Sequence, residues 1–387
     1  MKKWILGVLL AASSCPAQNY LEQAQAIQSR VIGIDAHNDT AQRVLIQGVD
    51  LATQLPDGQV DIPRLREGGM HAPFFALWVP TYYKGAEAVR RTLDLRDAMQ
   101  RVFDAHPDQI QMAITAGDVE DIVRAGKIAA VLTIEGGHQI DNDLAVLRMY
   151  YRMGIRSMTL THFLNNDWAD SSTDQPAHNG LTDFGREVVR EMNRLGMLVD
   201  VSHVADKTFY DVLAVSSKPV IASHSSCRAL VNVPRDMTDD MLRALAKNGG
   251  VVGITFGPGF VNPKDAEALM ARIGQQSQQE PNLMGKALDE YAAKEYLDGA
   301  DRQSQTGTAT VADVADHIDH AVKIAGIDHV GIGSDFDGIP NVPLGLGNVS
   351  KMTALTAVLL QRGYSESDIR KIMGGNFLRV MHEVMGK

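Results

Sequence analysis

The sequence has little cysteine and no dense block of basic residues. Cys15 and Cys227 are the only cysteines among 387 residues, and Cys15 lies in a segment that we expect to be removed. A disulfide within the mature chain is therefore excluded, and burial of apolar side chains must stabilise the fold. The formal net charge is −10, and no run is rich in lysine and arginine. The protein would therefore not attract a polyanion such as nucleic acid electrostatically.

Long apolar runs are also missing. Residues 1–17 comprise two lysines, a short apolar stretch and then small residues, an order typical of a bacterial secretory signal peptide. The apolar stretch is well short of the roughly 20 residues that span a bilayer. We predict cleavage after Ala17 and export to the periplasm. Lipidation of Cys15 is less favoured, because Ala12 stands three residues earlier, where a leucine is usual.

No linker or low-complexity tract divides residues 18–387, which we expect to form a single catalytic domain. Short apolar, β-branched runs alternate there with stretches in which apolar residues recur at helical spacing. The runs predict eight strands, at 31–34, 71–79, 128–134, 157–161, 198–201, 219–222, 250–256 and 329–333. Near-continuous apolar strands that alternate with helices are typical of a parallel sheet closed into a barrel. We therefore predict an α/β fold, the (β/α)8 TIM barrel.

An open, doubly wound sheet is the alternative. It would place a glycine-rich phosphate-binding turn after the first strand, whereas residues 35–39 read Asp-Ala-His-Asn-Asp.

The alternation of strands and helices is interrupted at about 257–310, between the seventh and eighth strands. In a barrel this insertion would lie on the catalytic face, where a lid, a subunit contact and a solvated helical excursion are all compatible with it. Helices at 352–362 and 366–384 would complete the outer ring.

Six of the predicted strands end in side chains that bind metals or exchange protons. These are His37 and Asp39 after the first strand, Glu135 after the third, His162 after the fourth, His203 after the fifth, His224 after the sixth and Asp335 after the eighth. A single histidine beside an apolar strand is more often structural than functional. A barrel, however, gathers the carboxyl ends of its strands in one mouth, so we expect these side chains to form one site.

The number of ligand groups predicts the number of metal ions. His37 and Asp39 project to the same face of an extended backbone, and Glu135, His203 and His224 bring the set to five. Five ligands exceed the three of an ordinary catalytic zinc and suit two ions that share a carboxylate. We predict two Zn2+ per chain, bridged by Glu135 and by a water or hydroxide. Such metal ions lower the pKa of the water towards neutrality and make it a nucleophile.

These motifs resemble those of the membrane (renal) dipeptidases, a family of binuclear zinc metallopeptidases with a barrel of the amidohydrolase type. The matching segments lie, in family order, at 34–39, 134–138, 160–162, 166–170, 199–203, 223–226 and 333–338. The resemblance implies a bacterial secreted enzyme that hydrolyses the peptide bond of dipeptides, including those with a D-residue at the C-terminal position. It also implies that His37 and Asp39 hold one zinc ion, that His203 and His224 hold the other, and that Glu135 bridges them.

Two further residues receive catalytic roles from the resemblance. His162 would donate a hydrogen bond to the tetrahedral oxyanion, and Asp335 would pass a proton from the hydroxide to the leaving amine. Asp337 lies two residues further on and shares the strand face of Asp335. Spacing alone therefore does not decide which of the two carboxylates transfers the proton, and the family resemblance favours Asp335.

A dipeptidase must also bind the free carboxylate of its substrate, for which a guanidinium is the best partner. The resemblance implies Arg235, although Asp236 follows it where family members usually have asparagine, and Arg228 is the alternative. We expect the protein to bind a small dipeptide as its substrate. We expect it neither to bind nucleic acid nor to have a stable membrane span. A homodimer is expected from family likeness alone, and the C-terminus lacks the apolar tail of lipid-anchored relatives.

Two other functions are weighed against the dipeptidase. A barrel hydrolase of lactones, phosphotriesters or cyclic amides would show two histidines in an H-x-H motif and a carbamylated lysine, where this chain has His37, Asp39 and Glu135. A catalytically inactive periplasmic protein that binds peptides or metal would have lost a ligand or Asp335, and none of these is missing from the sequence.

Overall fold

The structure is a computed structural model that describes residues 16–277, 285–287, 289–290 and 307–386. The predicted signal peptide lies outside these residues except for its last two, which begin helix α1 (Pro16–Gln28). Cleavage of the leader and lipidation of Cys15 therefore stay predictions. Part of the predicted insertion also lies outside the described residues.

Eight parallel strands form a closed barrel. Neighbouring strands pair in the order β2, β1, β9, β8, β7, β6, β5 and β4, and pairing of β2 with β4 closes the ring. Their bounds are β1 (Gly33–Asn38), β2 (Met70–Trp78), β4 (Ile128–Glu135), β5 (Ile155–Thr159), β6 (Leu198–Asp200), β7 (Ile221–Ser225), β8 (Val251–Ile254) and β9 (Val330–Ile332). The predicted (β/α)8 TIM barrel is confirmed, and all eight predicted strands are present.

One further strand, β3 (Ile110–Met112), pairs only with β4 and lies outside the barrel. It has no counterpart among the predicted strands, because the polar Gln111 interrupts its short run and leaves no continuous apolar pattern.

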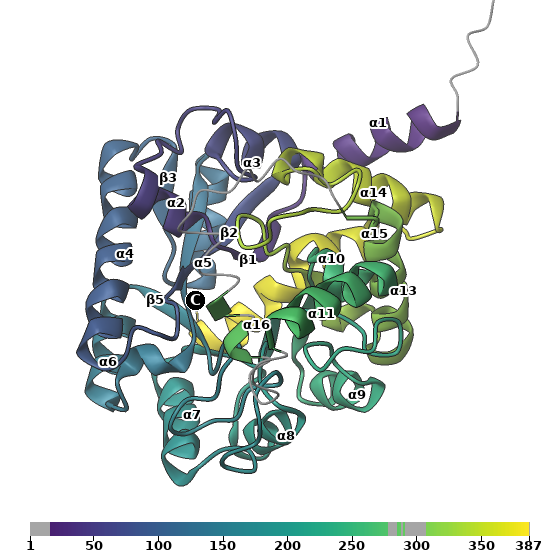
Figure 1. Cartoon of the computed structure of the whole chain (residues 1–387). Helices are drawn as coiled ribbons and strands as arrows, with labels where there is room; N and C mark the ends of the chain where they lie inside the picture. The colour runs from purple at the N-terminus through teal and green to yellow at the C-terminus, as the bar shows by residue number, and fades with distance from the viewer. Residues whose placement is uncertain (1–15, 278–284, 288, 291–306, 387) are drawn as a thin grey trace, which may run out of the picture.

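Helices surround the barrel (Figure 1). They are α2 (Thr40–Gln47), α3 (Ile62–Gly68), α4 (Ala86–Ala105), α5 (Ala116–Arg124), α6 (Leu144–Arg152), α7 (Asp183–Leu195), α8 (Asp206–Val215), α9 (Asp239–Lys247), α13 (Val311–Ala325) and α14 (Met352–Gln361). Helix α7 shows how the sequence sets such bounds. The Thr182 hydroxyl accepts a hydrogen bond from the Gly185 N–H at its start, and Gly196 ends it in the left-handed conformation that favours glycine.

The predicted helix at 366–384 is wrong in one respect. It is divided into α15 (Glu366–Arg370) and α16 (Asn376–Met385) by a π-helical turn at Lys371–Gly375. Gly374 in this turn packs against the start of β1, where a Cβ atom would lie 2.1 Å from the Ile32 carbonyl oxygen. The break therefore lets the backbone approach the barrel closely, at a position where only glycine fits.

Helix α16 closes the amino-terminal end of the barrel. The Arg379 guanidinium donates to the carbonyl oxygens of Gly249 and Asp328, which lie just before β8 and β9. Its Phe377 belongs to a buried apolar cluster to which several barrel strands contribute, with Ile34, Phe74, Val131, Leu198, Ile221 and Val251. Residues from opposite strands can meet only inside the barrel, so this cluster is its filled interior. Figure 1 accordingly shows α16 near the middle of the ring of helices.

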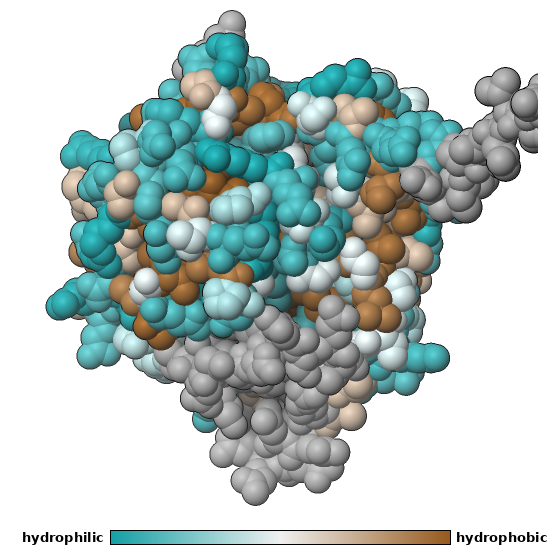
Figure 2. All heavy atoms as spheres, turned by 90° about the horizontal axis from the view of Figure 1, so that it is seen from above, coloured by the Kyte–Doolittle hydropathy of each residue, from teal (hydrophilic) through white to brown (hydrophobic). Residues whose placement is uncertain are grey.

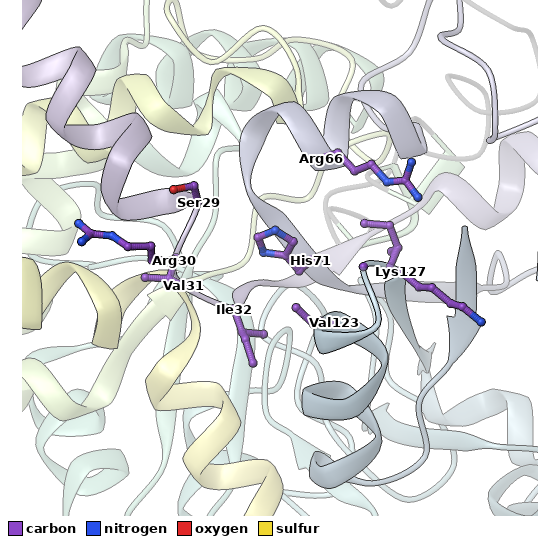
Figure 3. Close-up of a pocket in the computed structure, with 10 residues that line it drawn as sticks. Ser29, Arg30, Val31, Ile32, Arg66, His71, Val123 and Lys127 are labelled. Atoms are coloured by element: carbon purple, nitrogen blue, oxygen red, sulfur yellow. The ribbon is translucent and has the colours of Figure 1, made fainter. Parts of the chain in front are cut away.

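A cavity of about 320 Å³ lies at the same end of the barrel, against Ile32, His71 and Ile128 at the starts of three strands. Figure 3 shows that the side chains of Arg30 and Lys127 extend in opposite directions from it. Their positive charges therefore do not converge on a common point. In a barrel, residues at this end contribute to stability, whereas the active site lies at the carboxyl ends of the strands.

On the face drawn in Figure 2, hydrophobic residues lie in small groups among hydrophilic ones. Among the helices that the structure describes, none is long and apolar enough to cross a membrane.

Candidate metal centre

The predicted ligand residues converge at the carboxyl end of the barrel. His37 lies near the end of β1, Asp39 caps the start of α2, Glu135 ends β4, His203 follows β6 and His224 lies in β7. Each of these five residues is buried, with no more than 4% of its surface exposed. Ligand atoms of His37, Glu135 and His224 all lie within 4.8 Å of one another, and two further groups of this kind combine Glu135 and His203 with His162, and His37 and Asp39 with Asp335. The barrel thus brings together residues that are spread over nearly 190 positions of sequence.

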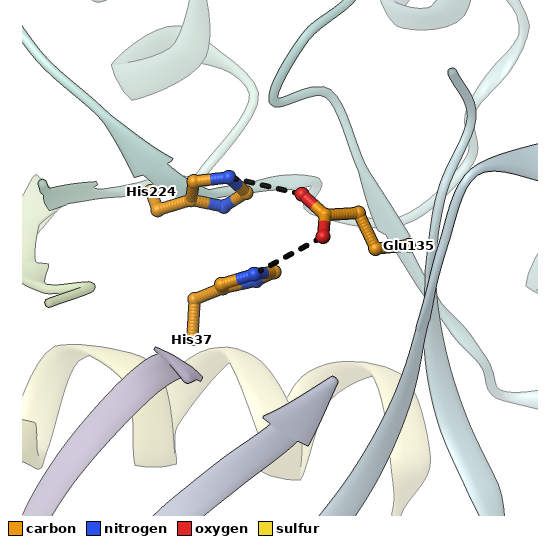
Figure 4. Close-up of side chains that lie close together, drawn as sticks. All are labelled: His37, Glu135 and His224. Carbon is orange, nitrogen blue, oxygen red and sulfur yellow. Dashed lines mark ion pairs between the residues drawn. The ribbon is translucent and has the colours of Figure 1, made fainter. Parts of the chain in front are cut away.

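Glu135 lies at the centre of the cluster, with its two carboxylate oxygens directed to different histidines (Figure 4). Oε2 is 3.5 Å from His37 Nε2, whereas Oε1 is 3.0 Å from His203 Nε2 and 3.2 Å from His224 Nε2. His37 Nε2 is also 3.5 Å from Asp39 Oδ2. A carboxylate with a different ligand group on each oxygen has the arrangement required to bridge two cations.

Two β-bulges turn the histidines towards this centre. Three steps along β1, from Asp35 to Asn38, oppose two steps along β2, and three steps along β7, from Ala222 to Ser225, oppose two along β8. Ile34 and Ile221 face the barrel interior, so strict alternation would direct His37 and His224 away from it. The extra residue in each strand reverses the direction of the side chains that follow it.

Asp200, at the end of β6, supports His224 from behind. The Ser223 hydroxyl donates to Asp200 Oδ2 at 2.5 Å and lies 2.8 Å from His224 Nδ1. Thr159 Oγ1 donates to the same carboxylate oxygen at 2.6 Å. Groups bonded to the second nitrogen of a histidine orient the ring towards a metal. We did not predict this role for Asp200, since its only signal in the sequence is a carboxylate at the end of an apolar strand.

The protonation of the cluster suits metal binding. Burial lowers the pKa of His203 and of His224 well below the ordinary value, and the charge of Arg235 adds to this effect for both, so both rings are neutral and able to bind a metal. Burial acts to raise the pKa of Glu135, but the surrounding histidines, including hydrogen bonds from His203 and His224, outweigh it and hold the pKa of this carboxyl well below its ordinary value.

A cation fits this donor set. Imidazole nitrogens and carboxylate oxygens are the usual ligands of zinc. His203 Nε2 and His224 Nε2 lie 3.0 Å apart, each with Glu135 Oε1 as a neighbour. His37 Nε2 is buried and has no hydrogen-bond partner among the described residues. Buried polar atoms normally have such partners, so the convergence of these atoms is explained by a bound metal.

The geometry separates Asp335 from Asp337. Asp335 forms a group of potential metal ligands with His37 and Asp39, whereas Asp337 accepts hydrogen bonds from the Thr40 hydroxyl at 2.7 Å and the Gln59 N–H at 2.8 Å. Asp337 therefore joins the start of α2 to the loop that contains Gln59, and Asp335 faces the cluster. Burial raises the pKa of Asp335 well above its ordinary value, and Asp39 and Glu135 add to this effect against the charges of His37 and Arg235.

Two site residues adopt the left-handed backbone conformation that non-glycine residues rarely take. His203 has φ 67° and Asp335 has φ 63°. Such conformations are held only where the surrounding structure imposes them, and they are frequent at functional sites.

His162 lies beside the predicted ligands, with its Nε2 3.9 Å from Glu135 Oε1. Its Nδ1 lies 3.2 Å from Asp289 Oδ1 and 3.3 Å from Trp78 Nε1. Asp289 belongs to the insertion, and the sequence analysis did not identify it because no motif marks it.

The two candidate arginines differ in their partners. Arg228 forms a bidentate pair with Asp206, with both N–O distances 2.7 Å. Arg235 is buried and donates through Nη2 to the His224 carbonyl oxygen at 2.6 Å, while its Nε and Nη1 have no hydrogen-bond partner among the described residues. No ion pair joins Arg235 to Asp236 in the described part of the chain. Arg235 therefore retains free donors next to a site residue, and Arg228 does not.

Known proteins resemble this chain in sequence and in fold. The family model described as Membrane dipeptidase (Peptidase family M19) matches residues 21–386. The chain belongs to the membrane dipeptidase family. Dipeptidase tcpJ from Claviceps purpurea is 39% identical over 337 residues, which cover 84% of this chain and 69% of that protein.

Solved structures agree with membership of the membrane dipeptidase family. The probable dipeptidase PvdM from Pseudomonas aeruginosa has a TM-score of 0.83 and 28% identity, covering 95% of this chain and 99% of that one. A metallo peptidase from Rhodobacter sphaeroides, liganded with a phosphinate mimic of the dipeptide L-Ala-D-Ala, has a TM-score of 0.75 and 25% identity, covering 92% and 99%. The protein is thus a hydrolase of the metallo-dipeptidase class, and the lactonase and binding-protein alternatives are not favoured.

Removal of the central carboxylate should release metal. We expect the Glu135→Ala variant of this membrane dipeptidase to lose at least half of the divalent metal that the parent retains after dialysis, because both halves of the cluster lose an oxygen ligand. Elemental analysis of the folded proteins measures this. Glu120→Ala is the matched control, since that carboxylate is 38% exposed and pairs with His382 on the surface. Equal metal content in Glu135→Ala and the parent would contradict the assignment.

Proposed function

We propose that the protein is a zinc-dependent dipeptidase that holds two Zn2+ per chain. His37 and Asp39 would bind one ion, His203 and His224 the other, and Glu135 both. The observation that supports this assignment is the direction of the two Glu135 oxygens, one towards His37 and the other towards the remaining pair of histidines.

The reaction that suits this site is hydrolysis of the peptide bond of a dipeptide. Bound zinc ions supply a water that is acidic enough to be deprotonated near neutral pH. Asp335 faces this position and would accept the proton, then transfer it to the amine nitrogen as the C–N bond breaks. His162 presents Nε2 to the same position and would donate a hydrogen bond to the carbonyl oxygen as negative charge develops on it.

Arg235 would bind the free carboxylate of the substrate. Its unpartnered Nε and Nη1 can donate charge-assisted hydrogen bonds to that group. Arg235 lies next to the His224 backbone, so a substrate bound there would place its peptide bond close to the cluster. The Rhodobacter relative with its L-Ala-D-Ala mimic supports the inclusion of L,D-dipeptides among the substrates.

The proposed location of the protein is the periplasm. The signal-peptide pattern of residues 1–17 supports export to the periplasm, where short peptides would be the available substrates. A homodimer stays a prediction from family likeness.

An assay on a panel of L,L- and L,D-dipeptides tests the function. We expect release of both amino acids, loss of activity on treatment with a chelator, and its return on addition of Zn2+. Elemental analysis should find about two zinc ions per chain. Failure of every dipeptide to react with the zinc-loaded protein would refute the proposal, and activity restricted to L,L-dipeptides would refute only the extension to D-residues.

Replacement of the proposed proton carrier should separate catalysis from metal binding. We expect Asp335→Asn to retain its zinc and to lower kcat by about 10²-fold or more, since general acid–base catalysis contributes that much. Asp337→Asn is the nearby comparison, and its main effect should be on thermal stability, because Asp337 joins Thr40 to Gln59. Near-normal kcat in Asp335→Asn would exclude the role.

The two arginines give a matched pair for substrate binding. We expect Arg235→Met to raise KM for dipeptides by roughly 10-fold or more, because the carboxylate loses a charge-assisted bond worth about 1.5–3 kcal/mol. Arg228→Met should leave KM nearly unchanged, since Arg228 already pairs with Asp206. Steady-state kinetics on one good substrate checks both, and the reverse ranking would transfer the role to Arg228.

A further inference from the structure

We propose that Asp289, in the insertion between β8 and α13, is a positioning residue that fixes the His162 ring for dipeptide hydrolysis. This inference rests on the proposed function and adds to it a residue outside the barrel strands. It also gives the insertion a definite role, as an element that contributes a side chain to the site.

Asp289 uses both carboxylate oxygens. Oδ1 lies 3.2 Å from His162 Nδ1, and Oδ2 accepts hydrogen bonds from the Thr81 hydroxyl at 2.6 Å and from the Thr81 N–H at 3.2 Å. Its side chain is only 4% exposed. Burial of a carboxylate is costly unless hydrogen bonds compensate it, and Thr81 and His162 supply them here.

Asp289 and Trp78 both approach the same nitrogen of the His162 ring. Trp78 Nε1 and Asp289 Oδ1 both approach Nδ1. The indole N–H can only donate and an ionised carboxylate can only accept, so Nδ1 pairs with one of them at a time. Either pairing holds the ring in the same orientation, with Nε2 directed to Glu135 Oε1 at 3.9 Å. Nε2 can donate when Nδ1 accepts from Trp78, and a ring that donates to Asp289 can donate from Nε2 only with both nitrogens protonated. Nε2 is the nitrogen that would meet the substrate oxygen.

The part of the insertion around Asp289 packs closely against the loop that follows β5. Residues 285–287 and 289–290 are helical. A Cβ atom at Gly285 would lie 2.3 Å from the Phe163 carbonyl oxygen, and the buried Ala287 packs against the Phe163 side chain. Phe163 directly follows His162, so the insertion contacts the loop after β5 at the same point where Asp289 contacts the histidine. The short helical segment is thus held in place by backbone contact, apolar packing and hydrogen bonds.

Steady-state kinetics of Asp289→Ala, Asp289→Asn and Glu290→Ala tests the inference. We expect Asp289→Ala to lower kcat by about 10- to 100-fold, the usual scale for loss of a group that orients a functional histidine. KM and zinc content should stay near the parent values, because Arg235 and the metal ligands are untouched. Asp289→Asn keeps the shape and one acceptor and should retain more activity than the alanine variant. Glu290 is the control, since it is exposed and pairs only loosely with Lys286 at 3.8 Å.

A double variant tests whether Asp289 positions His162 or only holds the insertion against the barrel. If Asp289 acts through His162, adding Asp289→Ala to His162→Asn should change kcat by no more than about twofold, because coupled residues are not additive. A crystal structure of Asp289→Ala should show the His162 ring turned or in more than one conformation.

Each adverse outcome has a distinct meaning. Multiplicative effects in the double variant, loss of zinc from Asp289→Ala, or kinetics of Asp289→Ala like those of Glu290→Ala would overturn the inference and leave the dipeptidase in place. An inactive parent protein would instead refute the proposed function, and the inference with it.

Discussion

The site depends on one buried carboxylate. Glu135 ends a strand in which every residue is buried, and an ionised group there is stable only among groups that compensate its charge. Histidines from three other strand ends supply that environment, and they approach its two oxygens separately. A closed barrel is what makes this possible, because it directs strand ends from all sides of a ring to a common centre.

A regular barrel alone would not produce the cluster. The bulges in β1 and β7 and the left-handed backbones of His203 and Asp335 are local departures from ideal geometry. They lie towards the carboxyl ends of the strands, whereas the interior cluster at the other end is ordinary apolar packing. The stable end of the barrel thus holds the irregular end in place, a division that is common in barrels of this kind.

Buried carboxylates behind the ligands join neighbouring strands. Asp35 accepts hydrogen bonds from the Ser334 N–H at 2.7 Å and the Ser334 hydroxyl at 2.6 Å, and the Asp335 N–H donates to the His37 carbonyl oxygen at 3.0 Å. Burial raises the pKa of Asp35 to about 6, although the Ser334 hydrogen bonds oppose it. Asp35 thereby joins the end of β1 to that of β9, as Asp200 joins β6 to β7. The strands that present the ligands are therefore fixed relative to one another.

The sequence by itself determined the barrel and most of the site. Eight apolar runs of strand length marked the strands, and the polar residues that follow them, from His37 to Asp335, had to meet once the sheet closed. Those signals are local, because side-chain periodicity and strand ends can be read within a few residues.

The contacts that distinguish similar residues are visible only in the tertiary structure. It separated Asp335 from Asp337 and Arg235 from Arg228, divided the last predicted helix at Gly374, and placed Asp289 against His162. Each of these outcomes depends on a contact between residues far apart in the chain, such as Asp337 with Gln59 or Asp289 with Thr81. No local pattern encodes such a contact, because it exists only when the closed barrel brings the two segments together.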